Sequence, residues 1–287
     1  MMNLTHVAPW LSKQGVWGPV TATLDWCEIN HQFSPYVAEM ANTFSNLFTI
    51  SLSLGGCMDA INEGLPNRYA LGYLGVALVG VGSFFFHATL LFEAQLADEL
   101  PMIYVGSLCL FMLFDTKGGF GLQTLRTKGL IALLILFDAL FTWSYMVYRN
   151  PVYHQAVFAS IVISTAARVA YILNSTEAGK GIPPKTKAVI TNFFSTGFGL
   201  FAFGFFVWNL DNLFCHKLTE WKLSIGWPAA FLLEGHSWWH VLTGLGTYYM
   251  FIGVQYATVC VKESHRDYVV KHDYGIPYLR RSHLKVH

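Results

Sequence analysis

The chain has 287 residues, of which 54% are hydrophobic and 12% are charged, with a mean hydropathy of +0.41. Soluble domains carry about 25% charged residues, so this composition excludes a soluble globular protein, and an aromatic content of 16% suits the interfacial belts of membrane proteins. The net charge of +1 and the lack of a basic cluster argue against a nucleic-acid partner.

Seven apolar segments follow one another, each close to the roughly 20 residues that a helix needs to cross a bilayer. Short connections rich in Gly, Pro, Asn and charged residues separate them, and residues 1–24 lack the basic start and apolar core of a cleavable signal peptide. The predicted fold class is therefore an all-α membrane protein, a seven-transmembrane helix bundle whose first helix is an uncleaved anchor. We expect its helices at 36–58, 69–90, 95–115, 128–148, 152–173, 189–213 and 229–259.

The basic residues predict the orientation of this bundle. Fourteen of the eighteen Lys and Arg residues lie on the side that holds the first, third and fifth connections and the C-terminus. The positive-inside rule then places the C-terminus in the cytoplasm and the N-terminus in the lumen. We expect a lumenal segment over 1–35, a transmembrane catalytic domain over 36–259, and a disordered cytoplasmic tail over 260–287. The four remaining basic residues are Lys13, Arg149, Lys217 and Lys222.

Three histidines lie inside the apolar segments. His236 and His240 are four residues apart in the seventh segment and so share a helix face, and His87 is near the lumenal end of the second. Two histidines at this spacing with a third from another helix are typical of a catalytic zinc site with one position open to water. The alternative, that each histidine bonds a neighbouring helix, is weaker for a set at one depth. The pattern predicts an intramembrane zinc hydrolase.

Two further polar residues are expected at the same depth. Asp98 lies about one turn into the third segment, and Ser83 lies four residues before His87, on the same helix face. A structural role stays open for both. Acidic residues are common near helix N-termini, and serine hydroxyls often bond their own helix backbone. No role is assigned to the charged residues Asp138, Arg168, Asp211 and Glu234.

Three stretches resemble the alkaline ceramidases, within a wider group of seven-helix hydrolases that includes the adiponectin receptors. The combinations Ser-x₃-His-x₁₀-Asp and His-x₃-His are marks of the wider group, and Asp-Trp-Cys-Glu-x-Asn is the more specific mark of the ceramidases. The stretches are Gly18–Asn46 with Asp25-Trp-Cys-Glu28-Ile-Asn30, Gly82–Tyr104 with Ser83, His87 and Asp98, and Gly235–Gly244 with His236 and His240.

The resemblance implies a role for each of these residues. His87, His236 and His240 would bind zinc, which lowers the pKa of its water to about 7. Asp98 would take a proton from that water and return it to the leaving amine, and Ser83 would bond the water or the developing oxyanion.

The resemblance also implies a calcium site. From spacing alone, the segment from Asp25 to Glu39 favours an acidic interfacial loop, although its hard oxygen ligands suit Ca²⁺. In the ceramidases the matching residues bind calcium. In this sequence they are Asp25, Glu28, Asn30, Glu39 and the carbonyl of Trp26. Such a site would brace the N-terminal segment against the helices that carry zinc and make activity calcium-sensitive.

The five cysteines divide by the predicted topology. Only Cys27 and Cys215 lie in lumenal segments, an oxidising setting, and we predict that they pair, as the resemblance also implies. The other three, Cys57, Cys109 and Cys260, are expected to be inert packing thiols.

The resemblance implies an amide hydrolase of the endoplasmic reticulum or Golgi membrane, with Zn²⁺ and Ca²⁺ as cofactors. It would hydrolyse ceramide, phytoceramide or dihydroceramide to a sphingoid base and a fatty acid. The lipid substrate would enter laterally from the bilayer. The alternative is a receptor of the adiponectin-receptor type, in which zinc is structural or hydrolysis serves signalling. Sequence alone does not decide the preferred sphingoid base or acyl length.

Overall fold

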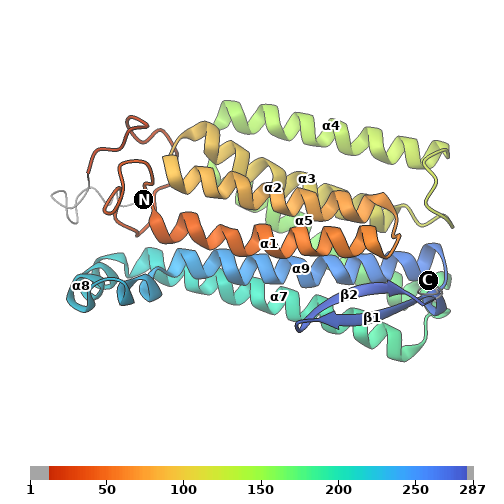
Figure 1. Ribbon diagram of the computed structural model, residues 1–287. Coiled ribbons are helices and arrows are strands. Elements are labelled where there is room, and N and C mark those ends of the chain that lie inside the picture. Colours follow the sequence, from red (N-terminus) through yellow and green to blue (C-terminus); the bar gives the residue numbers. More distant parts are fainter. Residues whose placement is uncertain (1–12, 283–287) are drawn as a thin grey trace.

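The computed structural model describes residues 13–282, so residues 1–12 of the expected lumenal segment and residues 283–287 of the tail lie outside the described residues. Within the described part, seven α-helices of 23 to 30 residues run alongside one another as a bundle (Figure 1). They are α1 (Met40–Asn62), α2 (Asn67–Thr89), α3 (Phe92–Phe114), α4 (Leu125–Tyr148), α5 (Pro151–Ser175), α7 (Pro184–Leu213) and α9 (Gly235–Lys262). The connections hold the short helices α6 (Glu177–Lys180) and α8 (Cys215–Ile225) and the 3₁₀ turns η2 (Ala229–Leu233) and η3 (His265–Asp267).

Five of the long helices, α2, α3, α4, α5 and α7, are long and apolar enough to cross a membrane. The protein is therefore an integral membrane protein with a mostly helical fold, as predicted. Helices α1 and α9 are of similar length but are not among the helices that are apolar enough by this measure, and α1 carries a row of buried polar residues. That seven helices cross the membrane, and in which direction, stays a prediction. The polar row of α1 consists of Asn42, Thr43, Asn46, Thr49 and Ser53.

Several helix boundaries differ from the sequence prediction. The first helix begins at Met40 instead of residue 36, because Glu39 is extended and its amide donates to the carbonyl of His87 at 3.0 Å. The last begins at Gly235 instead of 229, because η2 occupies the preceding residues. The sixth predicted segment begins earlier, at Pro184, where proline supplies a favoured first helical residue.

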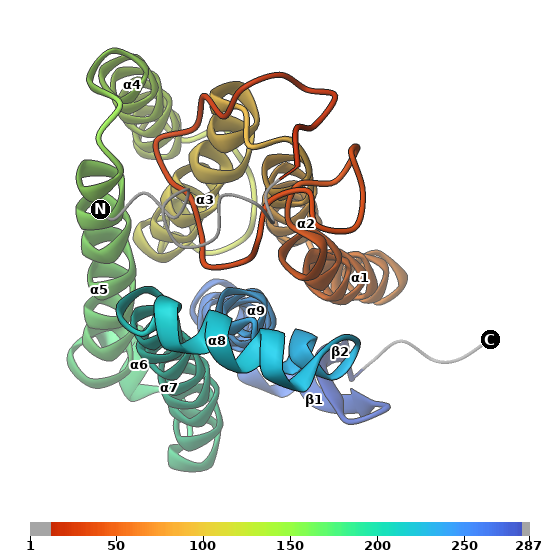
Figure 2. The same cartoon turned by 90° about the vertical axis from the view of Figure 1, so that its left-hand side faces the viewer.

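Helix α9 lies at the centre of the bundle, with α1, α2, α3, α5 and α7 around it (Figure 2). Its half from Met250 to Cys260 is buried throughout. Glycines let it approach its neighbours closely: a Cβ on Gly246 would lie 2.7 Å from the carbonyl oxygen of Gly197 in α7. Small residues at such crossings allow close helix packing, which is the main source of helix association in a membrane.

The expectation of a disordered C-terminal tail is wrong. Strands β1 (Tyr268–Asp273) and β2 (Ile276–Arg281) pair antiparallel, with Tyr268 opposite Arg281. Tyr274 and Gly275 both have positive φ, which suits a tight hairpin turn. Two buried side chains, Tyr268 and Leu279, join the main hydrophobic core, so apolar burial holds this charged segment on the bundle.

The ends of α2, α3, α4 and α9 opposite the N-terminal loop meet at one carboxylate. Asp115 is buried and accepts from Arg68 at 3.0 Å, from Lys262 at 2.9 Å and from Thr127 at 3.0 Å. Burial alone would raise the pKa of Asp115, but the hydrogen bonds from Lys262 and Arg68 outweigh it and hold that pKa below its usual value.

We expect Asp115→Asn to destabilise the protein by about 3–5 kcal/mol, because it leaves two buried cations without their counter-charge. The native pKa lies below the unfolded one, so this contribution is present above about pH 4 and is lost as the pH falls through the native pKa. Thermal unfolding in detergent as a function of pH measures both effects. The matched control is Glu177→Gln, which breaks a pair whose side chains are 63% and 88% exposed and should cost less than about 1 kcal/mol. Equal losses in the two variants would contradict the prediction.

Two charged residues with no assigned role make contacts between helices. Asp138 of α4 accepts from Ser107 of α3 at 2.7 Å. Arg168 of α5 donates to the carbonyl of Leu113 at 3.3 Å and lies 4.3 Å over the ring of Phe114. Both contacts join α3 to a neighbour, which explains how these polar groups are accommodated inside the bundle.

Candidate active site

Three histidine rings converge at the end of the bundle where the N-terminal loop lies. His87 comes from the last turns of α2, and His236 and His240 come from the first two turns of α9. Their ligand atoms all lie within 4.8 Å of one another, and all three rings are buried. In the part of the chain that the structure describes, this is the one such group of three His, Cys, Asp or Glu residues.

The rings fit a zinc ion. The Nε2 atoms of His87 and His236 are 3.3 Å apart, and a tetrahedral ion with Zn–N bonds of about 2.1 Å sets two ligand nitrogens about 3.4 Å apart. Three nitrogen ligands also leave a fourth position, as in catalytic zinc sites.

The other nitrogen of two of these rings is held by α1. Nδ1 of His87 donates to Oε2 of Glu39 at 2.5 Å. Nδ1 of His240 lies 2.8 Å from Oγ of Ser45, whose own hydrogen goes to the carbonyl of Asn42 at 3.0 Å. Both Nδ1 atoms are therefore donors, which leaves each Nε2 with a free lone pair for a metal.

The ring of His236 is held by stacking. The indole of Trp26 lies parallel to it, with centroids 3.8 Å apart and planes at 14°. Trp26 also packs edge-on against Trp208 of α7, at 5.8 Å. Nδ1 of His236 has no hydrogen-bond partner among the described residues, so this stacking on Trp26 is what restricts the rotamer of His236.

Ser83 and Asp98 lie together beside the histidines. The Ser83 side chain is hydrogen bonded to Asp98, and its Oγ lies 3.5 Å from Nε2 of His240. The pairing depends on Gly82, where a Cβ would lie 2.0 Å from the carbonyl oxygen of Ala97. Only glycine allows this approach, so it sets Ser83 of α2 against Asp98 of α3.

The neighbouring acid Glu99 points elsewhere. It is buried and accepts from the hydroxyl of Tyr145 in α4 and from Nε2 of Gln95 at 3.1 Å. Gln95 in turn bonds Thr23 of the N-terminal loop. Of the two adjacent acids, Asp98 is therefore the one that faces the histidines, and Glu99 joins α3 to α4.

Two apolar cavities of about 160 and 350 Å³ meet at this site. The smaller contains Ser83 and His240 in its wall and runs inward to Val254, and the larger reaches His236 and passes between α5 and α7. Asp98 belongs to both walls. The other shared residues are Met102, Phe158, Val162, Phe201 and Trp239.

The acidic loop that precedes α1 lies over the same end of the bundle (Figure 1). Asp25 accepts from the amide of Trp26 and the side chain of Asn30, and both oxygens of Glu28 accept from the amides of Ala41 and Asn42 at 2.7 and 2.9 Å. Glu28 therefore satisfies the free amides at the start of α1. The three carboxylates of the loop do not gather to the spacing that the histidines reach.

The donor set of this loop nevertheless fits a hard cation. Burial raises the pKa of Asp25, and burial together with the charge of Glu234 raises the pKa of Glu28 to about 8. Burial thus disfavours the charged form of both carboxyl groups, a penalty that a bound cation would offset. Oδ1 of Asn30 and Oε1 of Glu39 are buried without a partner in the described residues, so both are available as oxygen ligands for Ca²⁺.

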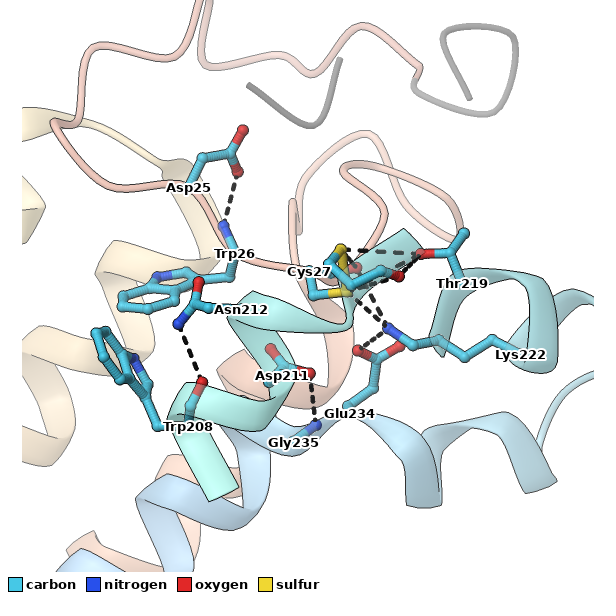
Figure 3. The surroundings of a disulfide bond; sticks show 11 residues. Asp25, Trp26, Cys27, Trp208, Asp211, Asn212, Thr219, Lys222, Glu234 and Gly235 are labelled. Carbon is cyan, nitrogen blue, oxygen red and sulfur yellow. Dashed lines mark hydrogen bonds and ion pairs between the residues drawn. A yellow bond between two sulfur atoms is a disulfide. The ribbon is translucent and has the colours of Figure 1, made fainter. Parts of the chain in front are cut away.

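A disulfide ties this loop to the rest of the molecule (Figure 3). Cys27 is bonded to Cys215, the first residue of α8, with Cα atoms 5.4 Å apart. The free cysteines Cys57, Cys109 and Cys260 are buried, as expected of packing residues.

Sequence reasoning missed the residues that hold the histidines. Glu39 was expected only as a calcium ligand, and Ser45 was given no role. A signal for Ser45 exists, since it lies three residues after Asn42 and four before Thr49 of the polar row and so shares their helix face. No sequence signal pairs Lys222 with Glu234, which are both buried and 2.7 Å apart.

The sequence of the chain is similar to those of known proteins. The sequence model of the ceramidase family matches residues 18–280. Alkaline ceramidase 3 of Mus musculus is 36% identical over 245 residues, covering 84% of this chain and 86% of its own. An alkaline ceramidase of Saccharomyces cerevisiae is 34% identical over 265 residues, covering 88% and 81%. An alkaline ceramidase of Arabidopsis thaliana is 27% identical over 234 residues, covering 81% and 82%.

Proposed function

The chain belongs to the ceramidase family, and we propose that it hydrolyses the amide bond of ceramides to release a sphingoid base and a fatty acid. The observation that carries the proposal is the convergence of three buried histidine nitrogens beside the Ser83–Asp98 pair, where two apolar cavities meet.

His87, His236 and His240 would hold the metal. A zinc ion there would supply Lewis-acid chemistry to a water molecule and to the amide carbonyl. The protein contributes the orientation of the ligands: Glu39 and Ser45 keep the protons of His87 and His240 on Nδ1. Mutation of a hydrogen-bond partner of this kind typically lowers metal affinity or activity by about 10–100-fold.

Asp98 is the proposed proton carrier. It would accept a proton from the attacking water and donate it to the amine as the C–N bond breaks, so one group serves as base and then as acid. Ser83 would first donate its one hydroxyl hydrogen to the Asp98 carboxylate and so hold it toward the reacting atoms. Once Asp98 has taken up the proton from water, that hydrogen would be free to bond the carbonyl oxygen as negative charge develops on it.

The two cavities suit a lipid with two chains. With its amide at Asp98, such a lipid would place one chain in the inner cavity toward Val254 and the other in the larger cavity between α5 and α7. The walls of both cavities are mainly apolar, which matches the chains of a ceramide and favours lateral entry from the bilayer.

We assign calcium to the acidic loop, with Asp25, Glu28, Asn30, Glu39 and the Trp26 carbonyl as ligands. Glu39 would serve both centres, because one of its oxygens bonds His87 and the other has no partner among the described residues. Calcium would thereby influence the orientation of a zinc ligand. The Cys27–Cys215 disulfide favours an oxidising compartment for this end of the bundle, in line with a lumenal N-terminus in the endoplasmic reticulum or Golgi.

Product release tests the function. Detergent-purified protein would be given ceramide, dihydroceramide and phytoceramide, with free sphingoid base measured by mass spectrometry. We expect release by the wild type and none above background by His240→Ala, which lacks one zinc ligand. No release from folded protein loaded with zinc and calcium would overturn the proposal, and the preferred species would identify the substrate.

A further inference from the structure

A fully buried lysine lies between the acidic loop and the start of α9. The side chain of Lys222 in α8 is 0% exposed, and its Nζ donates to Glu234 at 2.7 Å and to the carbonyl of Cys27 at 3.2 Å (Figure 3). A buried lysine is rare because its charge must leave water, so its surroundings have to supply compensation.

Both contacts of this lysine are close to expected metal ligands. Cys27 lies between Trp26 and Glu28 of the acidic loop, and the disulfide fixes it to α8. Glu234 precedes the first turn of α9, two residues before His236. The ammonium group of Lys222 therefore joins the acidic loop to α9, the helix that carries two of the three histidines.

The surroundings of Lys222 are strongly acidic. Besides Glu234, its charge acts on Glu28 and on Asp211 of α7. Asp211 itself accepts from the amide of Gly235 at 3.1 Å and so caps α9 from another helix (Figure 3). Lys222 thus stands among carboxylates that surround both the loop and the start of α9.

We propose that Lys222 is a built-in counter-cation of the acidic loop, which neutralises Glu234 and leaves Glu28 and its neighbours for one divalent ion. The inference rests on the proposed calcium site. Lys222 is a positioning residue: it touches no reacting atom and acts through Cys27 and Glu234.

The proposal predicts opposite effects for the two partners. Lys222→Met leaves the Glu234 carboxylate free beside the loop, so it should lower the half-saturating calcium concentration by about tenfold. Glu234→Gln leaves the ammonium without a counter-charge, so it should raise that concentration by a similar factor. The double variant should return close to the wild type, since neither charge is then present.

The readout is thermal unfolding of the purified full-length protein, titrated with calcium chloride from excess chelator at one fixed pH for all variants. The matched control is Lys217→Met, which removes a lysine of the same helix whose pair with Glu220 is exposed. It should not shift the titration. Without calcium, Lys222→Met should melt below the double variant, because it alone leaves a buried carboxylate unpaired.

Shifts in opposite directions, cancelled in the double variant, support the proposal. Shifts in the same direction, or no shift while the wild type responds to calcium, overturn it as a packing effect. If the melting temperature of the wild type does not respond to calcium, the proposed calcium site is wrong, and the inference about Lys222 is wrong with it. If Lys222→Met fails to fold, Glu234→Gln and the double variant still show whether the half-saturating calcium concentration shifts in the expected direction.

Discussion

Asp98→Asn is expected to lower kcat for ceramide hydrolysis by about 10²–10⁴-fold while the protein keeps its zinc. Asparagine has nearly the same shape and can still bond Ser83, but it cannot accept a proton from water or deliver one to the amine. Because Asp98 is not among the three converging nitrogen ligands, zinc content should stay at the wild-type level. Product release at saturating substrate, with zinc measured in the same preparation, checks both parts.

The matched control for Asp98→Asn is Glu93→Gln on the same helix, an exposed acid in the first turn of α3. It removes one negative charge about one and a half turns from Asp98 and should leave kcat within about twofold. An active Asp98→Asn protein with full zinc would remove Asp98 from the mechanism. Loss of zinc in that variant would show that Asp98 acts on the metal site instead.

Glu39→Gln is expected to weaken zinc binding by about 10–100-fold and to abolish the stabilisation by calcium. Glu39 is 0% exposed, with one oxygen on His87 and the other without a partner in the described residues. The amide replaces a charge-assisted hydrogen bond by a neutral one and removes a carboxylate ligand from the loop. Zinc retention during dialysis against chelators, and melting with and without calcium, measure the two losses separately.

Glu28→Gln separates the two roles of Glu39. The carboxylate of Glu28 bonds the amides of Ala41 and Asn42, and among the described residues it has no hydrogen bond to a histidine. Its replacement should therefore reduce the calcium response and leave zinc retention unchanged. If Glu28→Gln and Glu39→Gln lose zinc equally, the link from Glu39 to His87 is not what holds the zinc ligand.

The sequence predicted the class of protein and the three histidines that converge at its centre. Helices need long apolar segments in a bilayer, so composition and segment length were enough to predict the helical bundle. The i,i+4 spacing of His236 and His240 is local geometry that any helix imposes, and polar residues in apolar segments stand out. His87 stood out in the same way, and the family resemblance then selected Asp98 as the acid beside the histidines. Boundaries were less accurate, because extended residues and 3₁₀ turns share the apolar composition of the helices that follow them.

Only the tertiary structure decided which partners hold those groups. Glu39 and His87 are 48 residues apart in the sequence, and Lys222 and Cys27 are 195 apart. Their pairing depends on how α1, α2, α8 and the loop pack, and no local propensity encodes it. The C-terminal hairpin was missed for the same reason, because the charged composition of that segment favoured disorder. Burial of Tyr268 and Leu279 against the bundle supplies the stabilisation that the segment lacks alone.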